Sequence, residues 1–383
     1  MVRTQQPATI GEQALALHKK LGGKIRTQAL ARVTKESLRL LYTPGVGAVS
    51  QHLAAHPEDT RNMTSAGRMV AIVSDGSAVL GLGNIGPMGA LPVMEGKALL
   101  FKEFGGVDAV PLVLATQDPD EIVRIVQMVA PNFVGINLED IAAPHCFDIE
   151  ERLKNSLSIP VMHDDQHGTA IVVLAGLINA FKVVKKNITR SRVAIIGAGA
   201  AGTAIAKLLL QYGVMDVIVV DRKGIVSTRR EDLSPEKRQL AEITNREHRT
   251  GGVVEAVVGA DAIVGVSGPG TFWVEHVRIM AQRPIVFALA NPTPEISPED
   301  ARAGGAVVIA TGRSDYPNQI NNVLVFPGVF RGAIDNHVKT ITDEMKLKAA
   351  IKLASLVPHP TATKIIPTVF DRRVAKAIAS VIR

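Results

Sequence analysis

Two pairs of adjacent acids follow two short apolar segments in the first half of the chain. Glu139 and Asp140 end INLED, and Asp164 and Asp165 end MHDD. Binding sites of open α/β sheets form at the carboxyl ends of the strands. Carboxylates that converge there repel each other unless a cation lies among them, and oxygen ligands suit Mg²⁺ or Mn²⁺. Either pair alone is explained more simply by turn acids or a helix cap, but the two together favour a metal site.

A second metal-binding pattern lies in the same segment. His163 and His167 have the spacing of the two histidines in a zinc-binding helix. Because a predicted strand precedes them and Gly168 follows, we do not expect both imidazoles to share one helical face. Zinc therefore remains the lesser alternative to a carboxylate site.

A lysine, a tyrosine and two amides could also take part in chemistry. Lys97 lies in a predicted helix, residues 94–104, and Tyr42 lies in LYTPGVG. Taken alone, the lysine is more simply a solvent-facing helix residue and the tyrosine a packed ring. Asn291 ends PIVFALAN and Asn322 begins NVLVFPG, so their amides could bind a nicotinamide or a substrate carboxylate, or could simply be turn residues.

The stretch GAGAAG, residues 197–202, fits the dinucleotide fingerprint G-x-G-x-x-G in its full context. The predicted strand RVAII precedes it, an unbroken predicted helix follows, and the next strand, DVIVVD, ends in Asp221. Gly197 permits the tight turn, Gly199 lets the backbone approach a pyrophosphate, and Gly202 allows close helix packing. The helix N-terminus would face the phosphates, and Asp221 would bind the adenosine ribose.

A second stretch, GLGNIG at residues 81–86, fits the same pattern without that context. Pro87 and Pro92 follow it, so we expect no helix to open directly on these glycines. The acid at the corresponding distance, Asp108, precedes a predicted strand and does not end one. The stretch is therefore predicted to be a loop whose bare backbone approaches something else.

The elements that must position these residues alternate regularly along the chain. Short β-branched runs are separated by helical patterns, which predicts parallel sheets covered on both faces. The fold class is therefore α/β, with a boundary near residue 160. Residues 1–160 would form an N-terminal substrate and metal domain, and residues 161–383 a Rossmann-type doubly wound domain with C-terminal helices. The apolar helix predicted at 169–184 would bridge the two. The predicted strands are 70–76, 109–116, 133–140, 159–165, 192–199, 216–221, 261–267, 284–291, 306–312 and 322–328.

Composition restricts the function classes. The single cysteine, Cys146, excludes an internal disulfide and fits a reducing, cytoplasmic setting. The N-terminus lacks the apolar segment of a signal peptide. The net charge is +7, but the cations are scattered and aromatic residues make up only 4%, so we expect small anions and not nucleic acid or membrane as partners.

Taken together, these motifs resemble the malic enzyme family in its compact bacterial and archaeal form. They occur in that family's order and spacing over roughly residues 20–380. The matching stretches are LYTPGVG, SDGSAVLGLGNIGPMGALPVMEGKALLFKEFGGVDAVPL, INLEDIAAPHCF, PVMHDDQHGTA, GAGAAG, LANPTPE and NNVLVFPG. The resemblance implies oxidative decarboxylation of L-malate to pyruvate and CO₂ through oxaloacetate and enolpyruvate, with NAD or NADP and Mg²⁺ or Mn²⁺. Decarboxylation of oxaloacetate itself is also expected.

The resemblance also implies a role for each candidate residue. Lys97 would take the proton from the C2 hydroxyl, Asp164 would pair with Lys97, and Tyr42 would protonate C3 of enolpyruvate. The metal ligands would be Glu139, Asp140 and Asp165. Asn291 and Asn322 would contact substrate, and Asn291 also the cofactor. The further cofactor-binding residues would be Gly197, Ala198, Gly199, Gly202, Asp221 and Arg222, with Gly81, Gly83 and Gly86 lining the reaction cleft.

Several alternatives stay open at this point. Larger eukaryotic members carry an arginine after the Asp-Gly of the first strand, where this chain has Ser77 and Ala78. A malolactic enzyme would share nearly every motif but release lactate and retain its NAD. A non-catalytic dinucleotide sensor would have no reason to keep the converging carboxylates, the lysine and the tyrosine. Asp221 favours NAD, whereas Arg222 and Lys223 favour NADP, so use of both is expected. The family implies a homodimer.

Overall fold

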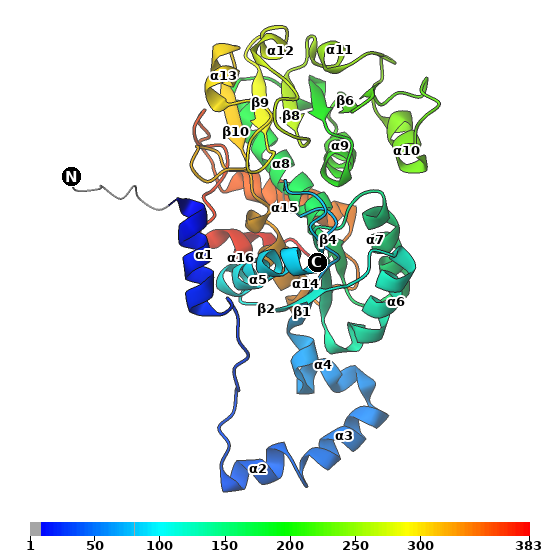
Figure 1. The fold of residues 1–383 in the computed structure, drawn as a ribbon, viewed down its shortest axis with the longest axis vertical. Coiled ribbons are helices and arrows are strands. Elements are labelled where there is room, and N and C mark those ends of the chain that lie inside the picture. The colour runs from blue at the N-terminus through cyan, green and yellow to red at the C-terminus, as the bar shows by residue number, and fades with distance from the viewer. Residues whose placement is uncertain (1–8, 80) are drawn as a thin grey trace, which may run out of the picture.

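The computed structural model describes residues 9–79 and 81–383 of the 383-residue chain. Its body contains two parallel sheets flanked by helices, with a helical arm at the N-terminal end (Figure 1). The predicted α/β class is therefore confirmed.

The first sheet has four parallel strands in the order β2-β1-β3-β4. Alternate residues of β1 point to opposite faces: Val70 and Ile72 pack on the side of α5, and Ala71 and Val73 on the side of α6 and α7. The strands are β1 (Met69–Ser74), β2 (Asp108–Val113), β3 (Gly135–Leu138) and β4 (Val161–His163), and the helices around them are α5 (Gly86–Gly105), α6 (Pro119–Val129), η3 (Ala130–Asn132) and α7 (His145–Ser156).

The second sheet has six strands in the order β10-β9-β8-β5-β6-β7, parallel except for the short antiparallel β7. Its strands are β5 (Arg192–Ile196), β6 (Asp216–Asp221), β7 (Gly224–Ile225), β8 (Ala262–Gly265), β9 (Ile285–Ala288) and β10 (Val308–Thr311). Its shorter helical segments are η4 (Ile188–Arg190), α9 (Ala200–Tyr212), α10 (Pro235–Ile243), α11 (Val253–Val257), α12 (Val274–Arg278) and α13 (Pro298–Ala303).

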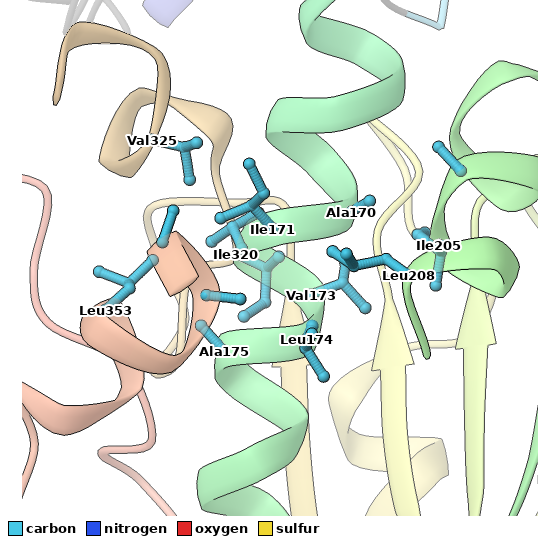
Figure 2. Packing of buried hydrophobic residues seen from close by; sticks show 14 of the residues in the cluster. Ala170, Ile171, Val173, Leu174, Ala175, Ile205, Leu208, Ile320, Val325 and Leu353 are labelled. Carbon is cyan, nitrogen blue, oxygen red and sulfur yellow. The ribbon is translucent and has the colours of Figure 1, made fainter. Parts of the chain in front are cut away.

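Helix α8 (Asp164–Val183) runs through the centre of the body and is buried along most of its length. Figure 2 shows its apolar side chains between Ile205 and Leu208 of α9 and Leu353 of α15. The helix is long and apolar enough to cross a membrane by length and composition, but the protein itself covers it, as in the core helix of a globular fold. The remaining C-terminal elements are η5 (Asn322–Leu324), α14 (Phe326–Asp335), α15 (Asp343–Ser355) and α16 (Arg373–Ala379).

The N-terminal arm, residues 10–63, has no core of its own. Within the described residues, none of its α-helices contains a buried side chain. Figure 1 shows α2 and α3 at its far end, away from both sheets. Backbone and side-chain groups of Lys24 tie the arm to α5, through Glu95 and the carbonyl of Pro92. The arm contains α1 (Ile10–Leu21), α2 (Lys35–Leu41), α3 (Val46–Ala55), η1 (Pro57–Asp59) and α4 (Thr60–Met63), and η2 (Ser65–Gly67) leads into β1.

Three sequence predictions were wrong in detail. Residues 322–328 form η5 and the start of α14, and not the predicted strand. The periodicity of a short buried apolar run does not distinguish a strand from a helix. Helix α5 does open directly on the glycines at Gly86, since Pro87 falls in its first turn, where no backbone donor is needed. Helix α8 begins at Asp164, five residues before the predicted start.

Candidate active site

The two acidic pairs meet at one edge of the first sheet. Strands β3 and β4 are parallel neighbours, and Leu138 at the end of β3 is level with His163 at the end of β4. Glu139 and Asp140 therefore leave the sheet beside Asp164 and Asp165, which begin α8. The expectation that these acids converge is confirmed.

Lys97 lies among these carboxylates. Its Nζ is 2.5 Å from Asp164 Oδ2 and 2.7 Å from Glu139 Oε1, and it lies 4.2 Å from the ring centroid of Phe326. The lysine is only 7% exposed, so the solvent-facing alternative is wrong. It occupies the apolar face of α5 with Met94 and Phe101, and this i, i+3, i+7 spacing is a signal that the sequence already contained.

The carboxylates determine the charge of this lysine. Burial alone lowers the pKa of an ammonium group, but Asp164, Glu139 and Asp165 outweigh that effect and raise the pKa of Lys97. Burial raises the pKa of Asp164 to about 6, against the opposing effect of Lys97. Lysine and aspartate therefore form a buried pair in which the Lys97 ammonium donates a short hydrogen bond to Asp164.

Glu139, Asp140 and Asp165 each offer an oxygen within 4.8 Å of the others, and they are the one group of three possible metal ligands among the described residues. The backbone N–H of Asp140 donates to Asp165 Oδ2 over 2.8 Å. Asp140 has a φ of 54°, in the left-handed region that aspartate tolerates better than most residues. Burial and the neighbouring acids raise the pKa of Glu139, although Lys97 opposes them. An oxygen-only set with excess negative charge fits a divalent cation such as Mg²⁺ or Mn²⁺.

Gly168 lets α8 bring two site residues together. A methyl group at this position would lie 1.8 Å from Asp164 Oδ1 and 3.2 Å from the Cβ of Asn322. Asn322 therefore lies close to Asp164, and its contact with substrate stays a prediction. Within the described part of the chain, the buried Asp164 Oδ1 has no hydrogen-bond partner, so one acceptor remains for a ligand.

The two histidines do not form a zinc site. His163 precedes α8 as its N-cap, whereas the His167 Nε2–H lies within the helix and contacts Glu150 Oε2 over 2.9 Å. Glu150 also accepts from the backbone N–H of His163 and from Lys154. Sequence reasoning missed Glu150, whose only signals are its i+4 lysine and its place beside the apolar Ile149. Glu150 holds the start of α8 in place through its contacts with His163 and His167.

The GAGAAG loop has the geometry that its sequence predicts. Gly197 has a φ of 123°, and a methyl group there would lie 2.4 Å from the Val266 carbonyl oxygen. At Gly202 a methyl group would lie 1.8 Å from the Gly197 carbonyl oxygen, so the helix packs closely on the turn. Gly199 has open space in front of it, where a pyrophosphate would lie at the N-terminus of α9. Ala198 lies between them in the same turn.

The GLGNIG loop joins the two halves of the body. A methyl group at Gly81 would lie 1.8 Å from the carbonyl oxygen of Asn291, so this loop packs directly on the segment after β9. Gly83 and Gly86 have φ values of 77° and 72°, which favour glycine. The backbone of this loop, in the first domain, therefore lies directly against the backbone of Asn291 in the second domain.

Ser77 and Ala78, in the region where larger eukaryotic members carry an arginine, support the acidic loop. Ser77 Oγ donates to Asp75 Oδ1 over 2.6 Å and accepts from the backbone N–H of Ala142 over 2.8 Å. The backbone N–H of Ala78 donates to the Asp140 carbonyl oxygen over 2.9 Å. These residues position Asp140 and do not present a cation to a substrate carboxylate.

Asp221 ends β6 as predicted, but other residues already bind its carboxylate. It accepts from Arg230, Lys237 and the backbone N–H of Lys223. Burial raises the pKa of Asp221, but these bonds outweigh it and leave the pKa lowered. Arg222 is exposed beside it.

Tyr42 is not part of this cluster within its own chain. It caps the C-terminal end of α2 and is 64% exposed. Since α2 lies at the far end of the arm, the chain brings Lys97 and the four acids together without Tyr42 (Figure 1).

The fold and the site together define a two-domain α/β protein with a dinucleotide-type glycine loop beside a lysine–carboxylate cluster. Residues 22–154 match the family described as malic enzyme, N-terminal domain, and residues 166–383 match the malic enzyme, NAD binding domain. The chain belongs to the malic enzyme family.

Relatives extend over nearly the whole chain. A bifunctional malic/malolactic enzyme of Bacillus subtilis is 50% identical over 98% of this chain and 92% of its own length. An NADP-dependent malic enzyme of Halomonas elongata is 42% identical over 97% of this chain and 92% of its own length. The crystal structure of an NAD-dependent malic enzyme from Thermotoga maritima has a TM-score of 0.93, with 48% identity, covering 96% of this chain and 98% of that chain.

Proposed function

We propose that this protein oxidises and decarboxylates L-malate to pyruvate and CO₂ with reduction of NAD or NADP, by way of oxaloacetate and enolpyruvate. The observation that carries the proposal is the buried Lys97, paired with Asp164 and Glu139, with Asp140 and Asp165 as two further possible ligand carboxylates. A base for the substrate hydroxyl and a set of cation ligands thus occupy one small volume.

Lys97 would receive the proton of the C2 hydroxyl at Nζ. Its own proton would first pass to Asp164 Oδ2, along the bond of 2.5 Å that joins them. A divalent cation held by Glu139, Asp140 and Asp165 would supply a Lewis acid that withdraws electron density from the substrate. Binding that cation would also offset the negative charge that now raises the pKa of Lys97, which favours the neutral amine.

Gly199, at the N-terminus of α9, would hold the pyrophosphate of a dinucleotide and Asn291 would contact its nicotinamide, which when bound would supply the hydride acceptor. Asn291, after β9, lies against Gly81 of the first domain, and Asn322, at the start of η5, lies against Gly168 in the first turns of α8. Their amides can orient a substrate carboxylate and the nicotinamide, which this chain must do without an arginine at Ser77 or Ala78.

A malolactic reaction is the second candidate, because a relative that covers nearly the whole chain bears both activities in its name. Both reactions begin with the same hydride transfer. They differ in whether the reduced dinucleotide leaves the protein or returns its hydride to the three-carbon product. An enzyme of either kind would also decarboxylate added oxaloacetate.

The decisive experiment measures absorbance at 340 nm and the organic products with L-malate, each dinucleotide, and Mn²⁺ or EDTA. Net NAD(P)H with equimolar pyruvate that disappears in EDTA supports a malic enzyme. Lactate without net NAD(P)H supports the malolactic reaction. Dinucleotide binding with neither product would contradict both and would leave a dinucleotide sensor.

The active form is proposed to be a homodimer whose arms are exchanged. Twelve large apolar side chains of the arm are exposed, and an isolated helical arm cannot retain its structure in water without burying such a surface. The body also exposes three apolar side chains in the GLGNIG loop and the first turn of α5, Leu82, Ile85 and Met88. A second copy that seats its arm there would bring Tyr42 to the site that lacks it. The exposed arm residues are Ile10, Leu15, Leu17, Leu21, Ile25, Leu30, Val33, Leu38, Leu40, Leu41, Tyr42 and Met63.

Complementation tests the exchange directly. Tyr42→Phe and Lys97→Met chains, each nearly inactive alone, are co-expressed and purified together. If Tyr42 acts on the partner's site, each mixed dimer contains one complete site, and activity returns to about a quarter of the wild-type value. If Tyr42 acts within its own chain, no mixed dimer contains a complete site and no activity returns.

A further inference from the structure

Glu295 is a buried acid outside the carboxylate cluster, in the segment between β9 and α13. The residue is only 1% exposed. Its Oε1 accepts from the backbone N–H of Ser267 over 2.8 Å, and its Oε2 accepts from the backbone N–H of Ala290 over 3.0 Å. Burial raises the pKa of Glu295, and the two N–H groups oppose this effect. Because these partners are backbone groups, the carboxylate joins two segments of the chain and does not serve a charged side chain.

The two segments follow neighbouring parallel strands of the second sheet. Ser267 lies two residues after the end of β8, and Ala290 lies two residues after the end of β9. A methyl group at Gly265 would lie 2.5 Å from Glu295 Cδ, so the glycine at the end of β8 leaves room for the carboxyl group. The backbone carbonyl of Glu295 also accepts from the N–H of Gly270 over 2.9 Å. Glu295 therefore holds the two loops together at the carboxyl edge of the sheet.

Each of these loops borders a different part of the proposed dinucleotide site. A methyl group at Gly197, in the GAGAAG turn, would lie 3.3 Å from the Cβ of Ser267. In the other loop, Ala290 directly precedes Asn291. Glu295 therefore lies between the turn that would hold the pyrophosphate and the residue that would contact the nicotinamide.

We propose that Glu295 is a positioning residue that sets the distance between the GAGAAG turn and Asn291, and thereby holds the Asn291 amide at the nicotinamide of a bound dinucleotide. The proposal rests on the proposed binding of a dinucleotide at GAGAAG. Glu295 acts through the backbone at Ser267 and Ala290 and does not touch the dinucleotide itself. Both oxygens and the full length of the side chain are required, because each oxygen serves one loop.

Comparing each dinucleotide with its own adenosine half tests this without malate, metal or turnover. Calorimetric titration compares NADH with 5′-ADP, and NADPH with 2′,5′-ADP; the halves reach the turn but lack the nicotinamide. Glu295→Gln keeps the shape of the side chain but turns an NH₂ group toward one backbone N–H, so one loop loses its acceptor. We expect the affinity advantage of the whole dinucleotide over its half to fall about tenfold, while the affinity for the half changes less than about twofold.

Two further variants separate position from charge and from stability. Glu295→Asp keeps the carboxylate but is one methylene shorter, so it cannot reach both loops and should lose the same advantage. Glu299→Gln is the matched control, because Glu299 is exposed in the first turn of α13, and it should retain the advantage. A general loss of stability would weaken whole and half nucleotides equally, so the ratio of the two affinities reports position.

Hydrogen exchange of the wild-type protein gives a second measurement, which does not depend on how the variants fold. The probe is the adenosine half that binds more tightly, which reaches the turn and not Asn291. Because Glu295 joins the two loops, this fragment should slow amide exchange in residues 289–296 as well as in residues 266–270. Unchanged exchange in residues 289–296 would contradict the proposal.

The outcomes separate this inference from the proposed function. If Glu295→Gln or Glu295→Asp retains the wild-type advantage, or if Glu299→Gln loses as much, the positioning role is refuted while malate oxidation stands. If the wild-type protein binds neither the dinucleotides nor their halves, the dinucleotide site is wrong, and both proposals fall.

Discussion

Two charged clusters lie at the carboxyl ends of the two sheets, and they differ in the sign of their excess charge. In the first sheet, Lys97 faces Glu139, Asp140, Asp164 and Asp165. In the second, three cations, Lys223, Arg230 and Lys237, pair with Asp221 and Asp232. The first cluster has a deficit of positive charge and the second a surplus, so the first suits a cation and the second an anion.

The acids respond in opposite ways because their surroundings differ. Burial and acidic neighbours raise the pKa of Glu139, while donors from Arg230 and Lys237 overcome burial and lower the pKa of Asp221. The first cluster is buried and its excess charge cannot be solvated, whereas the cations of the second reach water. A carboxylate at a strand end therefore does not define its ligand; the groups that pack around it do.

Removing the one cation of the first cluster should have the largest effect. Lys97→Met should lower kcat by about 10³-fold, because the proton acceptor for the substrate hydroxyl is lost. The rate of NAD(P)H formation measures this. Lys102→Met, on an exposed turn of the same helix, is the control and should retain activity. Near-normal turnover of the Lys97 variant would remove this lysine from the mechanism.

The same substitution should show that the two clusters contribute differently to the free energy of unfolding. Without metal, Lys97→Met leaves Glu139 and Asp164 buried without a counter-charge, which should cost about 3–5 kcal/mol of unfolding free energy. Arg230→Gln in the second cluster should cost only about 1 kcal/mol, since Lys237 still pairs with Asp221 and water reaches the site. Urea unfolding in EDTA measures both, and equal losses would contradict the contrast.

A smaller change to the first cluster should weaken its cation affinity. Asp165→Asn should lower the affinity for Mn²⁺ about 100-fold, because one charged ligand becomes neutral. Titration followed by electron paramagnetic resonance of free Mn²⁺ gives the dissociation constant without turnover. Asp148→Asn on the exposed side of α7 is the control, and an unchanged constant in the Asp165 variant would mean that the ligand set is different.

The smallest effect on stability is expected in the glycine loop. Gly199→Ala adds a methyl group into open space, so unfolding free energy should change by less than about 0.5 kcal/mol while binding of 5′-ADP weakens. Gly168→Ala places the same group against Asp164 Oδ1 and should be clearly destabilising. Thermal unfolding compares the two. Equal melting temperatures would show that the crowding at Gly168 is relieved at little cost.

Local patterns were sufficient to predict much of the site. The acidic pairs, their convergence and the fingerprint at Gly197 follow from strand ends and glycine spacing, which depend on nearby residues. The start of α8 and the position of Glu150 depend on packing between distant segments, so no local pattern indicates them. The hydrogen-bond partners of Asp221 could not be predicted either, since Arg230 and Lys237 lie nine and sixteen residues further along the chain. The domain boundary near residue 160 stays a prediction. Strand β4, which belongs to the first sheet, begins just after that boundary, at Val161.

Helix α8 has a mechanical consequence. Its first turn carries Asp164 and Asp165, while its length packs along α9, the helix that begins at the dinucleotide loop. Because α8 also continues directly from β4 of the first sheet, this one helix connects the carboxylate cluster to the element that carries the dinucleotide loop. By thermodynamic linkage, if a bound nucleotide raises the affinity for the metal by some factor, the bound metal raises the affinity for the nucleotide by the same factor.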